Sequence, residues 1–493
     1  MGDALRIENL TFTYAGADAP SLRDVSLRVA SGQLVVLAGA SGCGKTTLTR
    51  VISGLIPAFF EGELTGSATV GALNVIEAES WDTARQVGTV FQNPRTQFFT
   101  TDTASELAFG CENLGLPPDE TRRRVADAVA AHNLAGLMDR SVFALSGGEK
   151  QRLACGAVAA METPVLVLDE PSANLDARSV GELHAAIAHW LALGRTLIVA
   201  EHRLSYLREL VDAVFIMEDG RIISRLTGDQ FRSLDKPACN EMGLRSPVPV
   251  PLPKQRTGDA ASAELELSDV LVRRRRPAVP GRPLVKGRVT TLDIERCGFN
   301  AGAVTAVVGQ NGAGKTTLAN VLAGLGPRQR GVMTLEGVPI SWRQRWSRCY
   351  LVQQDVSHQL FTESAEREVM LACPHGTADP QAMAAEALAQ VNLTAFSTRH
   401  PLSLSAGQRQ RLAIACALAS GRPVAVFDEP TSGLDLHQMQ AIAVALRRLA
   451  DQGRVVLVIT HDAELITAVA DEVVELVHGR VAGTNAHLVK TGR

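Results

Sequence analysis

The stretch that decides the fold is GASGCGKTTL at residues 39–48, which follows the apolar run LVVLA and returns as GQNGAGKTTL at residues 309–318. Each copy has the pattern G-x-x-x-x-G-K-T, which is typical of a phosphate-binding loop between a strand and a helix. Glycines let backbone N–H groups point at phosphates, and the start of the helix adds partial positive charge. The first copy therefore predicts a strand over 34–38, a nucleotide-binding loop and a helix from residue 45.

Three further stretches recur in the same order. LSGGEKQRLA returns as LSAGQRQRLA, VLVLDEPSANLD returns as VAVFDEPTSGLD, and a strand that ends in histidine returns as a second such strand. The serine, aspartate and histidine of these stretches recur 259 residues later, as Ser146 and Ser405, Asp169 and Asp428, and His202 and His461. A fixed order and spacing indicate the duplication of one domain of about 230 residues.

The segment between the copies contains SPVPVPLP, with proline at alternate positions. Such a pattern favours an extended, semi-rigid spacer. We therefore expect a first domain over residues 1–235, a linker over 236–264 and a second domain over 265–493.

The composition of the 493 residues narrows the class of protein. Hydrophobic residues make up 46% and charged residues 20%, which is the balance of a folded globular protein. Aromatic residues make up only 4%, so the cores are expected to be aliphatic, as in α/β layers. The net charge of -3 argues against a broadly basic surface for nucleic acids. No apolar run reaches the roughly 18 residues of a membrane helix. The eight cysteines form no C-x-x-C pair and are expected to be reduced thiols.

The repeated polar residues suit phosphate chemistry. Lys45 is expected to reach the β- and γ-phosphates of a nucleotide and Thr46 to ligate Mg²⁺. Asp169 ends an apolar strand and suits the Mg²⁺ shell through water, and Glu170 beside it can polarise an attacking water as general base. His202, placed 33 residues after Asp169 as His461 is after Asp428, is expected to orient that water. The same roles in the second copy fall to Lys315, Thr316, Asp428, Glu429 and His461.

LSGGEKQRLA and LSAGQRQRLA resemble the signature motif of ABC ATPases, and the resemblance covers nearly the whole chain apart from the linker. It implies an α/β fold of tandem P-loop NTPase domains, each with a RecA-like α/β core, an antiparallel β subdomain and a helical signature subdomain. It also implies that the two halves pair head to tail on two ATP molecules with Mg²⁺. Each ATP would be held by the Walker motifs of one half and the signature of the other.

The resemblance assigns further residues by matching position. Gln92 and Gln354 look like the Q-loop glutamines, Asp176 and Asp435 close the D-loops, and Tyr14 looks like the aromatic that stacks on adenine. The implied ATP-binding set of the first half is Tyr14, Gly39, Ser41, Gly42, Gly44, Lys45, Thr46, Thr47, Gln92, Ser146, Gly147, Gly148, Asp169 and Asp176. In the second half it is Gly309, Asn311, Gly312, Gly314, Lys315, Thr316, Thr317, Gln354, Ser405, Gly407, Gln408, Asp428 and Asp435. The implied Mg²⁺ ligands are Thr46, Gln92, Asp169, Thr316, Gln354 and Asp428.

The second copy departs from the first at two places. Arg274 stands at the position of Tyr14, and Ala406 at the position of Gly147. An arginine can also stack on a base. The extra methyl group of Ala406 would crowd the phosphate or be tolerated if its φ is negative. Because both copies keep the lysine, glutamate and histidine, we expect two competent ATP sites of unequal rate.

The stretch FQNPRTQFFTTDTASELAFGCENLGLP, from Phe91, resembles the ATPases of energy-coupling-factor importers for vitamins and cobalt. The second copy keeps Gln359, Phe361 and Thr362 of this pattern. The resemblance implies a peripheral motor on the cytoplasmic face of the cell membrane, with a transmembrane coupling protein and a small substrate-capture membrane protein as partners and no nucleic acid. Helical segments at 102–145 and 363–404 would carry the docking grooves.

Two alternatives stay open. One is the twin ATPase of a sugar ABC importer, which has a similar length but lacks the QNPxxQFF pattern. The other is a soluble twin ABC protein that acts on ribosomes or DNA, although the linker here is proline-rich rather than a long charged helix. The sequence names no substrate: a vitamin, a vitamin precursor and a metal ion are all compatible with it.

Overall fold

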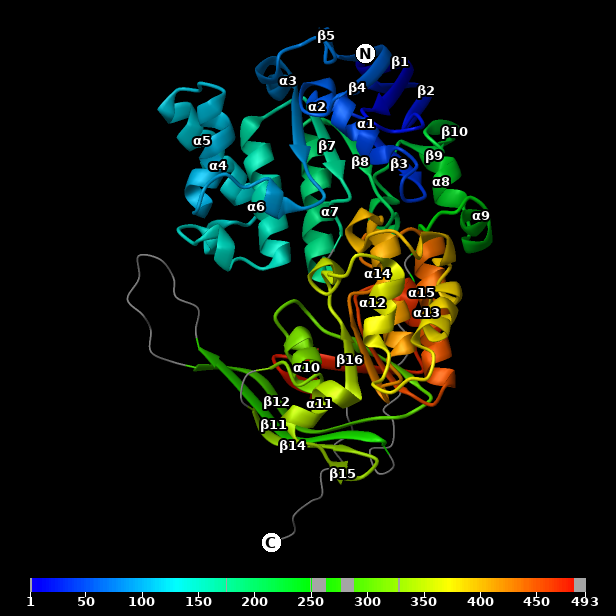
Figure 1. Cartoon of the computed structure of the whole chain (residues 1–493). Coiled ribbons are helices and arrows are strands. Elements are labelled where there is room, and N and C mark those ends of the chain that lie inside the picture. Colours follow the sequence, from blue (N-terminus) through cyan, green and yellow to red (C-terminus); the bar gives the residue numbers. More distant parts are fainter. Residues whose placement is uncertain are drawn as a thin grey trace. The chain divides into compact units, whose positions relative to one another are not determined.

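The computed structural model describes residues 2–173, 175–248, 250, 263–275, 288–326 and 329–482. These residues fall into two compact units, of which one ends before residue 250 and the other begins there (Figure 1). Each unit contains one six-stranded sheet, one four-stranded antiparallel sheet and a group of helices. The two units therefore have the same architecture, as the duplication predicts, and the tandem P-loop NTPase fold is confirmed.

In the first unit the six-stranded sheet has the order β10-β9-β3-β8-β7-β6, in which all neighbours are parallel except β10 and β9. Its strands are β3 (Leu34–Gly39), β6 (Val87–Val90), β7 (Val165–Asp169), β8 (Thr196–Ala200), β9 (Ala213–Glu218) and β10 (Arg221–Thr227). The antiparallel sheet β2-β1-β4-β5 consists of β1 (Asp3–Tyr14), β2 (Leu22–Ala30), β4 (Gly62–Val70) and β5 (Leu73–Asn74).

The six-stranded sheet is covered on both faces. On β3, Val35 and Leu37 point into a core shared with the four-stranded sheet and α1 (Lys45–Ile52). Leu34 and Val36 point into a core shared with α6 (Gly147–Met161) and α7 (Ala177–Ala192). Alternate residues of a strand face opposite sides of the sheet, so a strand buried on both faces is apolar throughout. This double burial explains the unbroken apolar runs of the sequence.

A group of helices forms a separate layer of the first unit. Figure 1 shows α4 (Thr103–Asn113) and α5 (Pro118–Ala131) beside α6, in cyan. This layer is the helical subdomain that the resemblance implies. The other helices of the unit are α2 (Leu55–Ala58), α3 (Ser80–Gln86), α8 (Gly228–Ser233) and α9 (Lys236–Glu241).

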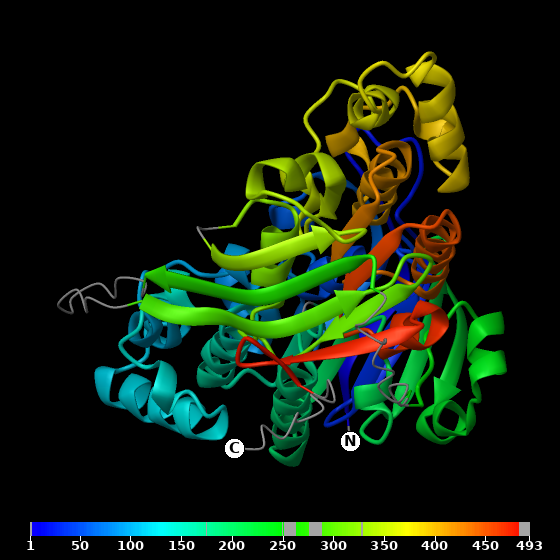
Figure 2. The same ribbon diagram turned by 90° about the horizontal axis from the view of Figure 1, so that it is seen from below.

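The second unit repeats this plan. Its large sheet has the order β16-β17-β18-β13-β19-β20, and its small sheet the order β12-β11-β14-β15. Figure 2 shows β11, β12 and β14 as long neighbouring strands. The strands are β11 (Leu265–Arg275), β12 (Arg288–Phe299), β13 (Val304–Val308), β14 (Gln329–Leu335), β15 (Val338–Pro339), β16 (Cys349–Val352), β17 (Val424–Asp428), β18 (Val455–Ile459), β19 (Glu472–Val477) and β20 (Arg480–Ala482). The helices are α10 (Lys315–Leu322), α11 (Trp342–Arg348), α12 (Ala365–Ala372), α13 (Pro380–Gln390), α14 (Ala406–Ala419), α15 (Leu436–Asp451) and α16 (Ala463–Val469).

The expected linker begins too early. Helix α9 lies inside the range 236–264, and its Cys239, together with Leu244, is buried in the core of the first unit. Burial of these two apolar side chains ties this part of the chain to the first domain. Most of the remaining expected linker, residues 251–262, lies outside the described residues.

Among the described residues, no helix has the length and apolar character needed to cross a bilayer. The helices α7 and α15 have 16 residues each, fewer than the roughly 20 that a span requires.

Candidate functional site

The phosphate-binding loop of each unit lies between a central strand and the helix that follows. In the first unit, Lys45 begins α1 and its Nζ donates to the carbonyl oxygens of Gly39 and Ala40, both at 2.9 Å. In the second unit, Nζ of Lys315 donates to Gly309 at 2.6 Å and Gln310 at 3.2 Å. The lysines are therefore folded back along their own loops, where the ammonium group is held close to any phosphate that enters the loop.

The glycines of the loop serve two different purposes. Gly39 has φ 144°, and a Cβ at this residue would collide with the carbonyl oxygen of Met217 on the neighbouring strand. A Cβ at Gly309 would collide in the same way with the carbonyl oxygen of Leu476. By contrast, a Cβ at Gly42, which has φ 82°, would meet no atom within 4 Å. The first glycine is thus required by packing, whereas the open side at Gly42 leaves the room that a phosphate needs.

The residues expected to hold Mg²⁺ form a matching oxygen set. In the first unit, Oγ1 of Thr46 donates to Oδ1 of Asp169 at 3.2 Å. Burial and the adjacent charge of Glu170 raise the pKa of Asp169 to about 6. Burial also raises the pKa of Asp428, although the hydrogen bond from Thr316 acts to lower it. Hydroxyl and carboxylate oxygens are ligands that Mg²⁺ prefers, and a cation would offset the cost of burying the carboxylate. The residues therefore fit Mg²⁺, which would neutralise phosphate charge when bound.

The glutamate after β7 is held between two side chains. Nε2 of Gln92 donates to Oε2 of Glu170 at 2.6 Å, and Nε2 of His202 lies 3.3 Å from Oε1. Glu170 itself has φ 43°, a left-handed conformation that is uncommon away from glycine. The Q-loop, the strand end and the histidine therefore meet at one carboxyl group.

The glutamate after β17 has the same backbone conformation and makes additional contacts with the end of β18. Glu429 has φ 52°, and Nε2 of His461 lies 3.6 Å from its Oε1. Its Oε2 accepts from Oγ1 of Thr460 at 3.3 Å and from the backbone N–H of His461 at 3.4 Å. The end of β18 therefore contacts the glutamate of the second unit directly.

Sequence analysis missed a residue that makes this difference. Glu201 stands where Thr460 stands in the second unit, and it is only 3% exposed. Its carboxyl group accepts from the N–H groups of His202 at 2.7 Å, Arg203 at 3.1 Å and Ser172 at 3.2 Å, and from the hydroxyl of Tyr206 at 3.0 Å. A charged residue directly after a buried strand and before the histidine was the signal that could have identified it.

The signature motif begins a capped helix in each unit. Ser146 caps α6 by accepting from the N–H of Glu149, whose side chain accepts in return from the N–H of Ser146. Ser405 and Gln408 form the same capping box on α14. Each serine is exposed and accepts within its own cap, so its O–H remains able to donate outward. The serine and the helix N-terminus together form an anion-binding end.

Ala406 causes no backbone strain. It is the first residue of α14, as Gly147 is of α6, and neither is among the described residues with positive φ. A Cβ at Gly147 would meet no atom within 4 Å. The protein itself therefore accommodates a methyl group at this position without strain.

The expected adenine-stacking residues differ between the units. Tyr14 packs edge-on against Phe12 and Phe60, and its hydroxyl lies 3.3 Å from Oγ1 of Thr47 and accepts from Arg50 at 2.9 Å. Tyr14 is thus attached to the helix that carries Lys45. Arg274 is an exposed residue of β11.

The D-loop aspartates act as helix caps within their units. Asp176 accepts from the N–H of Ser179 at the start of α7, and Asp435 accepts from that of Gln438 at the start of α15, both at 2.8 Å. In the first unit the structure brings together the phosphate loop, the two carboxylates, the Q-loop glutamine and the histidine. In the second unit it joins Thr316 of the phosphate loop to Asp428 and places His461 beside Glu429. Both units place the signature serine and the D-loop at capped helix ends.

A phosphate-binding loop that faces a buried aspartate and glutamate, together with a capped signature helix, defines an ATPase of the P-loop class. The sequence model of the family described as ABC transporter matches residues 22–173 and 293–432. The chain therefore belongs to the ABC transporter family. Membership supports ATP binding, normally with Mg²⁺, and ATP hydrolysis.

Relatives agree with this assignment. A "Putative ABC transporter ATP-binding protein" of Treponema denticola is 42% identical over 481 residues, covering 97% of this chain and 96% of the relative. A solved structure of an RNase-L inhibitor has a TM-score of 0.61 at 21% identity and covers 96% of this chain and 90% of its own. An archaeal ribosome recycling factor, solved with a ribosomal stalk protein, has a TM-score of 0.59 at 22% identity and covers 93% and 87%. At these identities the two structures show the shared tandem fold alone.

Proposed function

We propose that this chain is the ATP-hydrolysing motor of an importer of the energy-coupling-factor type. It acts at the cytoplasmic face of the membrane on a transmembrane coupling protein, with a separate small membrane protein that captures a vitamin, a vitamin precursor or a metal ion. The observation that carries the proposal is an exposed phenylalanine, Phe99 or Phe361, fixed beside the Q-loop of each unit.

Two side chains, a glutamine and a glutamate, hold the backbone around each phenylalanine by hydrogen bonds; we call each such set of hydrogen bonds a clamp. In the first unit, the side chain of Gln97 fixes the Q-loop. Its Oε1 accepts from the backbone N–H of Phe91 and its Nε2 donates to the carbonyl oxygen of Thr89, both at 3.1 Å. Oε2 of Glu106 accepts from the N–H groups of Phe99 at 3.1 Å and Thr100 at 2.8 Å. These residues belong to the stretch that resembles importer ATPases, so the motif has a structural purpose: it presents Phe99.

The second unit repeats both clamps. Oε1 of Gln359 accepts from the backbone N–H of Gln353 at 2.9 Å, and its Nε2 donates to the carbonyl oxygen of Leu351 at 2.7 Å. Glu368 accepts from the N–H groups of Phe361 at 3.0 Å and Thr362 at 2.8 Å. Phe99 is 74% exposed and Phe361 is 72% exposed. A large apolar side chain that is fixed in water by buried polar contacts marks an interaction surface.

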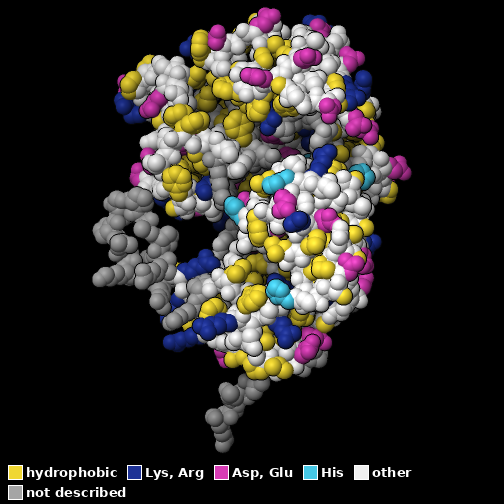
Figure 3. All heavy atoms as spheres, in the orientation of Figure 1, with side chains coloured by type: hydrophobic (Ala, Val, Ile, Leu, Met, Phe, Trp, Pro, Cys, Tyr) yellow, Lys and Arg dark blue, Asp and Glu magenta, His cyan; other side chains and the backbone are white. Residues whose placement is uncertain are grey.

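The surroundings suit a helix of a protein partner. In the second unit, Phe361 lines a cavity of about 370 Å³ together with the exposed apolar residues Leu325, Trp346 and Leu371. In the first unit, Phe99 stacks on Phe109 at 5.0 Å between ring centroids. Figure 3 shows hydrophobic side chains gathered over the helical subdomain of the first unit. An apolar groove of this kind accepts an amphipathic helix. Phe109 and Leu371 lie inside the segments predicted to carry the docking grooves, and Phe99 and Phe361 lie just before them.

We also propose residue roles within this motor. Glu170 and Glu429 act as general bases toward the attacking water, with His202 and His461 orienting it. The remaining Walker, Q-loop, signature and D-loop residues of the two predicted ATP-binding sets hold ATP and Mg²⁺, each nucleotide between the Walker motifs of one half and the signature of the other.

Purification of the full chain from detergent-solubilised membranes tests the proposal. We expect a polytopic membrane protein and a second small membrane protein to be recovered with it. The double variant Phe99→Asp, Phe361→Asp should lose these partners and keep ATP binding. The matched control Ile223→Asp, Val444→Asp changes two residues that are 56% and 51% exposed elsewhere, and it should retain the partners. Recovery of ribosomes, or of no membrane protein, would contradict the proposal.

A further inference from the structure

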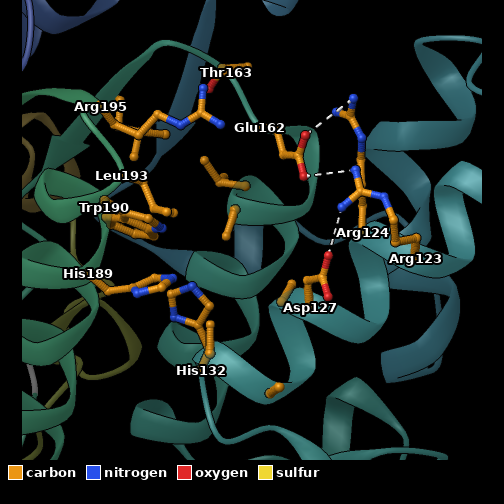
Figure 4. A pocket seen from close by; sticks show the side chains of 16 residues that line it. Arg123, Arg124, Asp127, His132, Glu162, Thr163, His189, Trp190, Leu193 and Arg195 are labelled. Atoms are coloured by element: carbon orange, nitrogen blue, oxygen red, sulfur yellow. Dashed lines mark hydrogen bonds and ion pairs between the residues drawn. The ribbon is translucent and has the colours of Figure 1, made fainter.

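A cavity of about 690 Å³ lies in the first unit, away from the residues of the ATP site. Its walls come from α5, the end of α6 and the end of α7 (Figure 4). Ala128, Val158, Ala159, Leu166 and Leu193 make much of the lining apolar. Ligand pockets for small molecules have volumes of about 300–1,000 Å³ and largely apolar walls with a few polar groups. The cavity has the size and lining of such a pocket.

One cation in the cavity has no counter-ion in the described part of the chain. Arg124 donates to Glu120 at 2.7 Å, and Glu162 lies 3.3 Å and 3.4 Å from Arg123 and Arg124. Arg195, which is half-buried, makes no side-chain hydrogen bond or ion pair with a described residue. Figure 4 shows its guanidinium group extending into the cavity on the side opposite these ion pairs. The guanidinium is therefore available to an anion that enters.

Two buried polar side chains also lack partners. Trp190 is 3% exposed and His132 is 6% exposed, and their rings lie 5.3 Å apart. Neither Nε1 of Trp190 nor Nε2 of His132 has a hydrogen-bond partner among the described residues. Burial, with the charge of His189, lowers the pKa of His132 to about 4, so its ring is neutral at pH 7. Buried polar atoms are normally paired, and an unpaired one costs about 1–3 kcal/mol.

The second unit has removed each of these features. Val391 stands at the position of His132 and Leu449 at that of Trp190, so both polar atoms are absent. Arg454 stands at the position of Arg195, but its guanidinium donates to the carbonyl oxygens of Ala417 at 2.9 Å and Leu418 at 3.0 Å, at the end of α14. The same framework is therefore stable with apolar residues and a paired arginine, and it does not itself require the unpaired groups of the first unit.

We propose that the cavity of the first unit binds a small heteroaromatic carboxylate. The planar guanidinium of Arg195 pairs with the carboxylate in a bidentate contact, which is the geometry that arginine favours. The ring of the ligand packs on Leu193 beside the indole of Trp190. The indole N–H is covered by neighbouring atoms in the structure, so the ligand displaces them when one of its ring atoms, a nitrogen or an oxygen, accepts from this N–H. The ligand bridges the helical subdomain and α7, so its binding stabilises their arrangement by mass action.

The test measures binding of named probes to the full chain by calorimetry and thermal shift. The probes are nicotinate, picolinate and quinoline-2-carboxylate, with benzoate as the ring without an acceptor and nicotinamide as the uncharged analogue. We expect at least one heteroaromatic carboxylate to bind with a stoichiometry of one per chain and a Kd below about 1 mM. Benzoate should bind at least about threefold more weakly, and nicotinamide at least about tenfold more weakly.

Variants locate the site. Arg195→Ala should weaken binding at least about tenfold. Trp190→Phe, which keeps an aromatic side chain but replaces the indole by a smaller ring without the N–H, should weaken it about threefold or more. Arg178→Ala changes an exposed arginine at the opposite end of α7, away from the cavity, and should leave binding unchanged. If Arg195→Ala fails to fold, Arg195→Gln provides the same comparison. No binding of any carboxylate up to about 10 mM, or binding that the Arg195 variant does not change, would overturn the proposal. Equal binding of nicotinamide would also overturn it.

Discussion

The two catalytic centres share one framework but fix the glutamate differently. In the first unit, the strand-end N–H of His202 is taken by Glu201, and Glu170 is held by Gln92. In the second unit, the corresponding N–H of His461 points at Glu429 itself. The duplication has thus preserved the backbone that places the base and has rebuilt the hydrogen bonds that orient it. A difference of this kind changes the orientation of the proposed base while every proposed catalytic side chain remains present.

The helical subdomains show the same principle away from the ATP site. The first unit buries polar His132 and Trp190 where the second unit buries Val391 and Leu449. The backbone is again similar, but the unpaired polar groups around the cavity belong to the first copy. Paired variants, one in each unit, can therefore separate what the fold needs from what one copy has added.

The largest expected effect is on local stability at the strand ends. Glu201→Ala leaves three buried N–H groups and the Tyr206 hydroxyl without their acceptor, which we expect to cost about 4 kcal/mol. Thr460→Ala removes one hydroxyl and should cost about 1 kcal/mol. Amide exchange measured by mass spectrometry on β7 and β8, and separately on β17 and β18, reports each unit. The first variant should speed exchange in β8 about a thousandfold. If Glu201→Ala and Thr460→Ala speed amide exchange by similar factors, the two strand ends do not differ as we propose.

A smaller effect concerns the pH dependence of the first unit. Burial lowers the pKa of His132 to about 4, from the ordinary histidine value of about 6.5. Between these pH values the unfolded chain binds more protons, so the stability present at pH 7 is lost as the pH falls from 6.5 toward 4. The loss approaches about 3 kcal/mol. His132→Val, which copies the second unit, should flatten this part of the pH profile.

Amide exchange of α5 and α7 at several pH values measures this loss. The helices α13 and α15 of the second unit, where Val391 stands, are the internal control. An unchanged pH profile in His132→Val would contradict the assignment.

The smallest effect is expected at the signature helices. Gly147→Ala adds a methyl group where no atom lies within 4 Å, and Ala406→Gly removes one from the matching site. Each should change stability by less than about 1 kcal/mol, because both positions have ordinary helical φ. ATP turnover should change less than about twofold for either variant. A large loss in Gly147→Ala would show that the methyl group crowds a phosphate.

Much of the framework is predictable from the sequence because it depends on local patterns. The apolar runs predict the doubly buried strands, and G-x-x-x-x-G-K-T predicts the loop and the start of α1. The recurrence of each stretch predicts that the two units are alike. These signals are strong because glycine conformation and strand burial are determined by neighbours in the chain.

The remaining features depend on contacts between distant residues. The sequence does not reveal that Gly39 is required by the carbonyl of Met217, or that Glu201 collects four donors from two loops. The end of the first domain was placed too early because α9 is short and its apolar residues are few, so their burial was not visible as a pattern. The sequence does not reveal the cavity because His132, directly after α5, and Trp190, on α7, are far apart in the chain.

The most direct test of the unequal centres compares Glu170→Gln with Glu429→Gln in the full chain. Each change removes the proposed base of one unit and keeps the size of the side chain. ATP turnover is measured at saturating nucleotide and Mg²⁺, together with nucleotide binding to confirm that both sites are filled. We expect both variants to bind ATP and to differ in residual turnover by about threefold or more, because their glutamates are oriented by different partners. Equal residual rates in the two variants would contradict the account.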